Sequence, residues 1–109
     1  MTDPDIRDNA ERRRYELAVD GDVAVVTYNL SPPNLMIAET LVPERLEGQG
    51  LAGRLARHVI ADAQERGLLI LPVCPFFSTY LRKHPEHAAT VHPAYRSILG
   101  LPEPGEPQS

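Results

Sequence analysis

The chain has 109 residues, a formal net charge of -4 at pH 7 and one cysteine. This length suits one domain with a core of its own, and the acidic balance without a long basic block argues against a nucleic-acid-binding surface. A single cysteine excludes an intrachain disulfide, and no apolar run approaches the length of a membrane span. We therefore expect a cytoplasmic protein, a monomer or weak dimer, without a nucleic-acid or membrane partner.

The first half of the chain predicts an antiparallel meander of three strands. Residues 14–19 alternate apolar and polar side chains, residues 23–30 are rich in β-branched side chains, and residues 35–42 form a third strand. Asp20-Gly21-Asp22 predicts a hairpin turn between the first two strands. The prolines at 32 and 33 set the boundary before the third, because proline does not fit inside a central strand.

The second half predicts one right-handed βαβ unit followed by shorter helices. Residues 51–66 form an amphipathic helix that ends near Gly67. Its apolar stripe is Leu51, Leu55, Val59 and Ala63, and its polar face is Arg54, Arg57, His58 and Glu65. Residues 68–71 are a continuous apolar run, the pattern of a strand buried on both faces. Residues 76–83 predict a second helix, and residues 93–99 a last helical or irregular piece.

These elements predict an α+β fold, in which an antiparallel β meander leads into one βαβ unit and helices flank a central mixed sheet. We expect a single domain over residues 11–99. Residues 1–10 are expected to be a flexible N-terminus and residues 100–109 a disordered, proline-rich tail.

Three glycines, Gly48, Gly50 and Gly53, separate the third strand from the long helix. Glycines let backbone N–H groups converge without Cβ crowding, and the helix start adds unpaired N–H groups and the positive end of its dipole. Such a turn cradles a phosphate or pyrophosphate. No lysine follows, so this is not the phosphate loop of the nucleotide hydrolases. The alternative without a ligand is close packing of helix on strand.

The same glycines also satisfy the Gly-x-Gly-x-x-Gly pattern of dinucleotide sites. A nicotinamide site needs an Asp or Glu about 20 residues further on, whereas residues 68–74 contain no acid. The chain is also too short for both halves of a dinucleotide fold. A meander leading into one βαβ unit, with a phosphate turn at the crossover, is instead the order expected of an acyltransferase that binds coenzyme A.

On these residues the chain resembles the GNAT superfamily of acetyl-CoA-dependent N-acetyltransferases, and more narrowly its minimal single-domain branch. The family's phosphate motif, Arg/Gln-x-x-Gly-x-Gly/Ala, stands here as Glu47-Gly48-Gln49-Gly50-Leu51-Ala52, with Glu47 in place of the basic or amide residue. Further similar segments, in chain order, are Arg14–Leu17, Glu39-Thr40 (where the branch commonly has His-Thr), Val42-Pro43, Leu71–Phe76 and His84–Glu86. The likeness spans about residues 7–95.

The resemblance implies acetyl transfer to an amine, either a small molecule or a lysine-like side chain, with acetyl-CoA as cofactor. The alternative is a catalytically weak module of the same fold that binds CoA or acyl-CoA in a regulatory role. The implied cofactor contacts are Leu41, Val42, Gly48, Gln49, Gly50, Leu51, Ala52, Gly53 and Arg54.

Three side chains are candidates for catalysis. Cys74 is expected near the acetyl group, as a nucleophile or as a small buried apolar residue. Tyr80 is expected to return a proton to the departing thiolate or to pack beside Phe76 or Phe77. Glu39 is the candidate general base or an exposed strand carboxylate. The four histidines and the cysteine lack the spacing of a metal site.

Overall fold

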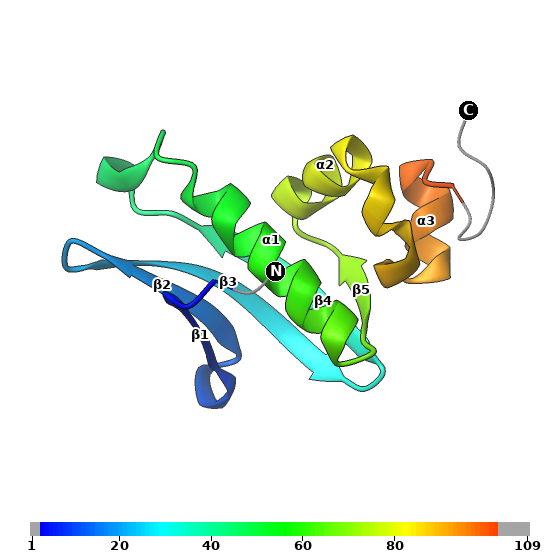
Figure 1. Cartoon of the computed structure of the whole chain (residues 1–109), viewed down its shortest axis with the longest axis horizontal. Coiled ribbons are helices and arrows are strands. Elements are labelled where there is room, and N and C mark those ends of the chain that lie inside the picture. The colour runs from blue at the N-terminus through cyan, green and yellow to red at the C-terminus, as the bar shows by residue number, and fades with distance from the viewer. Residues whose placement is uncertain (1–2, 103–109) are drawn as a thin grey trace.

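The computed structural model of the protein describes residues 3–102 and contains one five-stranded sheet (Figure 1). The strands, in both chain and spatial order, are β1 (Ile6–Asn9), β2 (Arg14–Val19), β3 (Asp22–Ser31), β4 (Asn34–Leu41) and β5 (Leu69–Pro72). β1 to β4 pair antiparallel, and β4 pairs with β5 in parallel. The structure therefore confirms the predicted meander and the predicted α+β fold.

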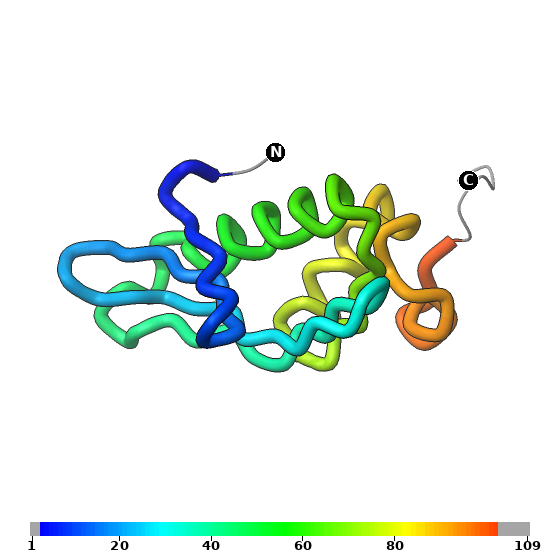
Figure 2. Tube along the Cα trace, turned by 90° about the horizontal axis from the view of Figure 1, so that it is seen from below, coloured from blue at the N-terminus to red at the C-terminus, as the bar shows by residue number. Residues whose placement is uncertain are grey.

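The helices lie on one face and at one end of this sheet. They are α1 (Leu51–Glu65), α2 (Pro75–Lys83) and α3 (Pro93–Leu99), with 3-10 segments η1 (Ala10–Arg12), η2 (Glu44–Leu46) and η3 (Pro85–Thr90). α1 runs along one face of the sheet, whereas α2, η3 and α3 gather beside β5 (Figures 1 and 2). The predicted apolar stripe of α1 is buried as expected, because it packs into the core shared with the strands.

Residues 6–9 form a strand within the segment that is expected from the sequence to be a flexible N-terminus. Ile6–Asn9 pair with β2, with Ile6 opposite Leu17. The Ile6 side chain is buried and belongs to the core. No periodic pattern could mark this strand, because Ile6 is its one buried residue. The predicted tail over residues 100–109 lies mostly outside the described residues.

The chain before β1 also lies against α1, where it covers one residue that the sequence predicts on the exposed, polar face of this helix. The Asp3 N–H donates a hydrogen bond to His58 Nδ1 at 2.8 Å, and the His58 ring meets the Tyr15 ring edge-on at 5.7 Å between centroids. His58 is therefore buried, whereas the sequence analysis places it on the polar face. The expectation was wrong because the partner that covers His58 lies 55 residues earlier in the chain.

β5 is buried on one face rather than on both. Ile70 is fully buried, but Leu69 and Leu71 are half-buried, so the strand shows the alternation of a one-sided strand. Its outer edge is closed by Val91, which forms a bridge with Ile70, and by the His92 N–H, which donates to the Ile70 carbonyl. The apolar run at residues 68–71 is explained by this position at the end of the sheet, where η3 and α3 lie beside β5.

β4 contains a β-bulge that changes which residues face α1. Ile37 lies opposite Tyr28, but Glu39 lies opposite Thr27, so Ala38 is the extra residue. Paired residues of antiparallel strands share a face. Beyond the bulge Thr40 therefore faces α1, and Glu39 faces away from it.

A hydrogen-bonded network ties α1 to three strands. The Tyr15 hydroxyl donates to the Asp62 carboxylate at 2.6 Å, and the Tyr28 hydroxyl donates to Asp8 of β1. Arg66 joins the two carboxylates, at 3.0 Å from Asp62 and 3.5 Å from Asp8. Burial and the nearby carboxylates raise the pKa of both tyrosines well above its ordinary value, which keeps both phenols protonated as donors.

Candidate functional site

The candidate site begins where β4 and β5 separate. The last paired residues are Ile37 and Pro72, and the Cys74 N–H still donates to the Ile37 carbonyl at 2.9 Å. α2 then begins at Pro75, whereas β4 continues to Leu41 against β3 alone. The edge of β4 beyond Ile37 is therefore not paired with β5, and its backbone groups on that side are available to an extended ligand.

A cavity of about 320 Å³ opens beside this edge, and we call it the β4-edge cavity. It is lined by Thr40, Leu41, Val42, Glu47, Ala52 and Phe76. The structure thus brings together the end of β4, the start of α1 and the start of α2. Two predicted cofactor residues of β4 and its following loop, Leu41 and Val42, lie in its wall.

The glycine turn at the start of α1 has the conformation that a phosphate cradle needs. Gly48 and Gly50 have φ of 84° and 74°, in the left-handed region that favours glycine. The first intrahelical bond runs from the Arg54 N–H to the Gly50 carbonyl at 3.1 Å. The N–H groups of Leu51, Ala52 and Gly53 precede it and have no partner within the helix. No side chain caps this end of α1, and no acidic residue lies in its first turn.

Arg54 is not available to a ligand in the way that the sequence analysis expects. Its guanidinium donates to both oxygens of Asp3 and to Asp5, at 2.9 to 3.2 Å. These carboxylates raise the pKa of Arg54, which stays protonated, and their negative charges compensate its positive charge. Gly48, Gln49 and Gly50 are by contrast exposed at the mouth of the turn.

Cys74 lies at the end of β5, as predicted, and is 3% exposed. Its Sγ lies 3.4 Å from the Thr40 hydroxyl, whose side chain lines the β4-edge cavity. Thr40 is a site residue that sequence reasoning did not single out. The Glu39-Thr40 pair quoted for the family resemblance was the available signal.

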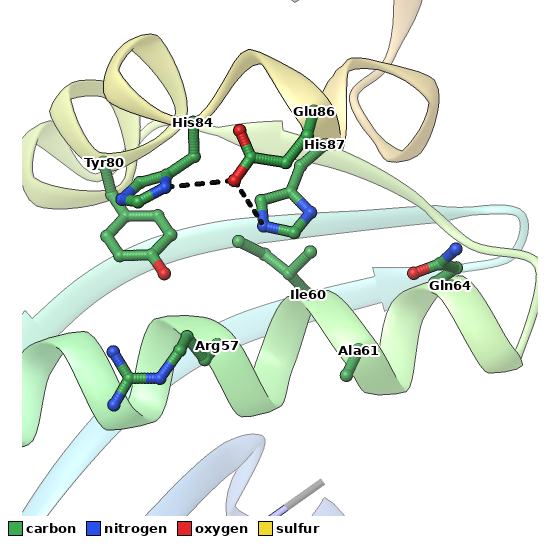
Figure 3. A pocket seen from close by; sticks show the side chains of 8 residues that line it. All are labelled: Arg57, Ile60, Ala61, Gln64, Tyr80, His84, Glu86 and His87. Carbon is green, nitrogen blue, oxygen red and sulfur yellow. Dashed lines mark hydrogen bonds and ion pairs between the residues drawn. The ribbon is translucent and has the colours of Figure 1, made fainter. Parts of the chain in front are cut away.

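Tyr80 lies in a second, larger cavity. This interhelix cavity of about 510 Å³ lies between α1 on one side and α2 with η3 on the other (Figure 3). It is lined by Arg57, Ile60, Ala61, Gln64, Tyr80, His84, Glu86 and His87. The Tyr80 ring stacks on the His84 ring at 4.3 Å and lies 6.2 Å from Phe76. Tyr80 is thus separate from Thr40 and Leu41, although Phe76, one turn earlier on α2, lines the β4-edge cavity.

Glu39 is exposed and faces away from α1, on the side of the sheet opposite Thr40. The structure therefore does not gather the three predicted catalytic side chains at one point. Cys74 adjoins the β4-edge cavity, Tyr80 lines the interhelix cavity, and Glu39 is open to solvent.

The histidines of the interhelix cavity surround one carboxylate. Glu86 Oε2 lies 3.2 Å from His84 Nδ1 and 4.0 Å from His87 Nε2. Burial lowers the pKa of His87 below its ordinary value, so His87 is neutral at pH 7. Across residues 3–102, no cluster of three or more histidine, cysteine or acidic side chains has the arrangement of a metal site. Over the same range, no helix combines the length and apolar character needed to cross a membrane.

Comparisons with known proteins place this geometry in a family. The family model of the GCN5-related N-acetyltransferases matches residues 14–91, more than half of the chain. Among solved structures, the chain is similar to the solution structure of a GCN5-like N-acetyltransferase candidate from Staphylococcus aureus. The TM-score is 0.65 and the identity 24%, over 84% of this chain and 91% of that one. The comparison with curated proteins gives no match. The protein belongs to the GCN5-related N-acetyltransferase family.

Proposed function

We propose that the protein transfers the acetyl group of acetyl-CoA to an amine. One observation carries this proposal: the unpaired edge of β4, the β4-edge cavity and the glycine turn meet at one end of the sheet. The N–H groups of Leu51, Ala52 and Gly53 suit a pyrophosphate. The free edge of β4 at Leu41, continuing into Val42, suits the amides of a pantetheine arm, which would occupy the place of a missing strand.

The backbone at this edge also supplies the main chemistry. When bound, acetyl-CoA supplies an activated acetyl thioester. An N–H group of β4 directed at the thioester carbonyl would stabilise the oxyanion that forms on attack by the amine, an effect on the order of 10²–10³ in rate. A thiolate leaving group needs only a weak acid, so water suffices for its protonation.

The acceptor is proposed to approach from the solvent side of β4. Glu39 faces that side, and its carboxylate would accept a proton from an ammonium group directly or through water. The net charge of -4 favours a cationic amine or a lysine side chain over an anionic acceptor. We assign to Cys74 a place at the acetyl end, beside Thr40.

Alkylation of Cys74 tests this assignment, because it is the chain's one cysteine. We expect saturating acetyl-CoA to slow alkylation by iodoacetamide at least severalfold, measured by intact mass. Protein unfolded in urea is the control and should be alkylated rapidly with or without the ligand. Equal rates for the folded protein in both conditions would place Cys74 away from the acetyl group. Full activity of Cys74→Ala would show that the amine attacks acetyl-CoA directly, without an acetyl-cysteine step.

A second candidate function is a CoA-binding module with weak turnover. The dispersed positions of Cys74, Tyr80 and Glu39 favour it, because no proton relay is assembled at one point. Calorimetric titration with CoA and acetyl transfer to a mixture of amines separate the two functions. Binding with acetyl transfer supports the enzyme. Binding without measurable transfer supports the module, and no binding contradicts both.

A further inference from the structure

The face of the sheet that points away from α1 carries an apolar patch. Paired residues share a face, and Val25 of β3 lies opposite Leu41 of β4, while Val23 lies opposite Ala18 of β2. These four residues adjoin one another across three strands, and we call them the outer patch. Leu41 is 50% exposed and Val23 42%. The reason is that α1 covers the other face, and no helix within residues 3–102 lies over the outward side of β2 and β3 (Figure 2).

Val25 shows that the outer patch is a packed surface rather than a set of scattered side chains. Its neighbours in β3, Ala24 and Val26, both belong to the core, so Val25 points outward. Its side chain is nevertheless only 7% exposed, although it lies outside the core cluster. The side chains around it, Leu41 among them, therefore close over it and form a continuous apolar surface.

Glu39 places one negative charge beside the outer patch. It precedes Leu41 by two residues, so both side chains face outward beyond the bulge. Within residues 3–102 its carboxylate makes neither a hydrogen bond nor an ion pair. The other acids of β2, β3 and β4 are Glu16 and Asp22, and each is bound to an arginine. Glu39 is therefore the one unpaired acid of these three strands.

The position and the size of the outer patch suit the body of a small amine. Glu39 would hold an ammonium group beside the free edge of β4, where the acetyl thioester is proposed to lie. The step from Glu39 to Leu41 is roughly 7 Å along the strand, and β4 is roughly 10 Å from β2. A stable interface between proteins takes about 800 Å² from each partner, several times the area of this patch. The patch is thus too small for a protein and large enough for a short alkyl chain or one aromatic ring.

We infer that the acceptor is a small primary amine with an apolar body, bound with its ammonium group at Glu39 and its body on the outer patch. The inference rests on the proposed function and deepens it by naming the substrate class. A diamine or an amino sugar would bring a charged or hydroxyl group onto Val23 and Val25, where no polar side chain of the patch replaces the water that this group loses.

Three amines of the same length test this substrate class: hexylamine, 6-aminohexan-1-ol and hexane-1,6-diamine, each with saturating acetyl-CoA. Their reacting ends are alike, and their far ends carry a methyl, a hydroxyl or a second ammonium group. We expect kcat/KM for hexylamine to exceed the other two values by about fivefold or more, because only the methyl group gains from contact with the outer patch. Equal values, or a preference for either polar amine, would overturn the inference.

Val23→Ser tests the outer patch itself, because Val23 is not one of the proposed cofactor contacts. It should reduce the preference for hexylamine over 6-aminohexan-1-ol by about twofold to threefold. Leu30→Ser, at the other end of β3 and with a similar exposed fraction, is the matched control and should leave this preference unchanged. Thermal unfolding shows whether both variants are folded. Equal changes of preference in two folded variants would place the amine elsewhere.

Further outcomes separate the other occupants of this face. Glu39→Gln should raise KM for hexylamine severalfold, because it removes the charge that attracts the ammonium group, and an unchanged KM would overturn that contact. Faster acetylation of Nα-acetyl-lysine methylamide than of hexylamine would assign the site to lysine side chains. A dimer in sedimentation equilibrium that Val23→Ser dissociates would assign the outer patch to a second copy. Acetylation of none of these amines would refute the proposed function itself, whereas the other outcomes refute only the acceptor class.

Discussion

Gly53 illustrates how a single missing side chain links stability to binding. It lies in the first turn of α1, and its backbone conformation does not require glycine. Glycine inside a helix costs about 0.5–1 kcal/mol relative to alanine. The missing side chain leaves space next to the N–H groups at the start of α1 and beside Arg57. Such a space is consistent with close approach of a ligand to the backbone.

We expect Gly53→Ala to raise the free energy of unfolding by about 0.5–1 kcal/mol and to weaken CoA binding severalfold. The added methyl group favours the helix and stands where the pyrophosphate would approach. Urea denaturation and calorimetric titration measure the two effects. Gly67→Ala is the control with opposite sign, because φ of 67° at that position disfavours a Cβ. Unchanged CoA affinity in a more stable Gly53→Ala protein would show that the turn is not a ligand contact.

At the scale of single elements, the local pattern predicted most of the fold. The meander, α1 and α2 repeat their periodicity over six or more residues, so neighbours in sequence reveal the buried side. β1 and the bulge at Ala38 were not predicted, because both depend on pairing with another strand. The glycine turn and the position of Cys74 were predictable from local order as well. The pairing of Arg54 was not predictable, because its partner Asp3 lies 51 residues away in the sequence.

The contribution of β1 can be measured through its one buried side chain. We expect Ile6→Ala to lower the free energy of unfolding by about 2 kcal/mol or more, because Ile6 is 7% exposed and joins the core. Arg7→Ala, at the neighbouring exposed position, should change it by less than about 0.5 kcal/mol. Urea midpoints of both variants provide the comparison. Equal, small effects of the two substitutions would show that β1 adds little to the stability of the fold.

For the whole molecule, the network around Asp62 holds the sheet and α1 in one orientation. The Tyr15 hydroxyl donates to Asp62 from a fully buried ring, and Arg66 links Asp62 to Asp8 of β1. Elements separated by 47 residues in sequence are thereby joined. The relative placement of the glycine turn on α1 and the free edge of β4 depends on this joint.

We expect Asp62→Ala to destabilise the protein by about 1–3 kcal/mol, because it leaves a buried hydroxyl without its acceptor. The effect should shrink when Tyr15→Phe removes the hydroxyl as well, giving a coupling energy in a double-mutant cycle. Glu65→Ala, at an exposed position on the same helix, is the control. Additive effects of the two substitutions would show that the hydrogen bond contributes nothing to folding.

The extra residue in β4 decides which of two neighbouring side chains meets Cys74. Strict alternation from Ile37 through Ala38 would turn Glu39 beneath α1 and Thr40 toward solvent, and the bulge reverses this order. Deletion of Ala38 should therefore leave Glu39 opposite Thr27 and Thr40 opposite Val26, because it removes only the residue that has no partner in β3. The inside and the outside of the site are thus specified by the pairing of β4 with β3, and not by the alternation of side chains within β4 itself.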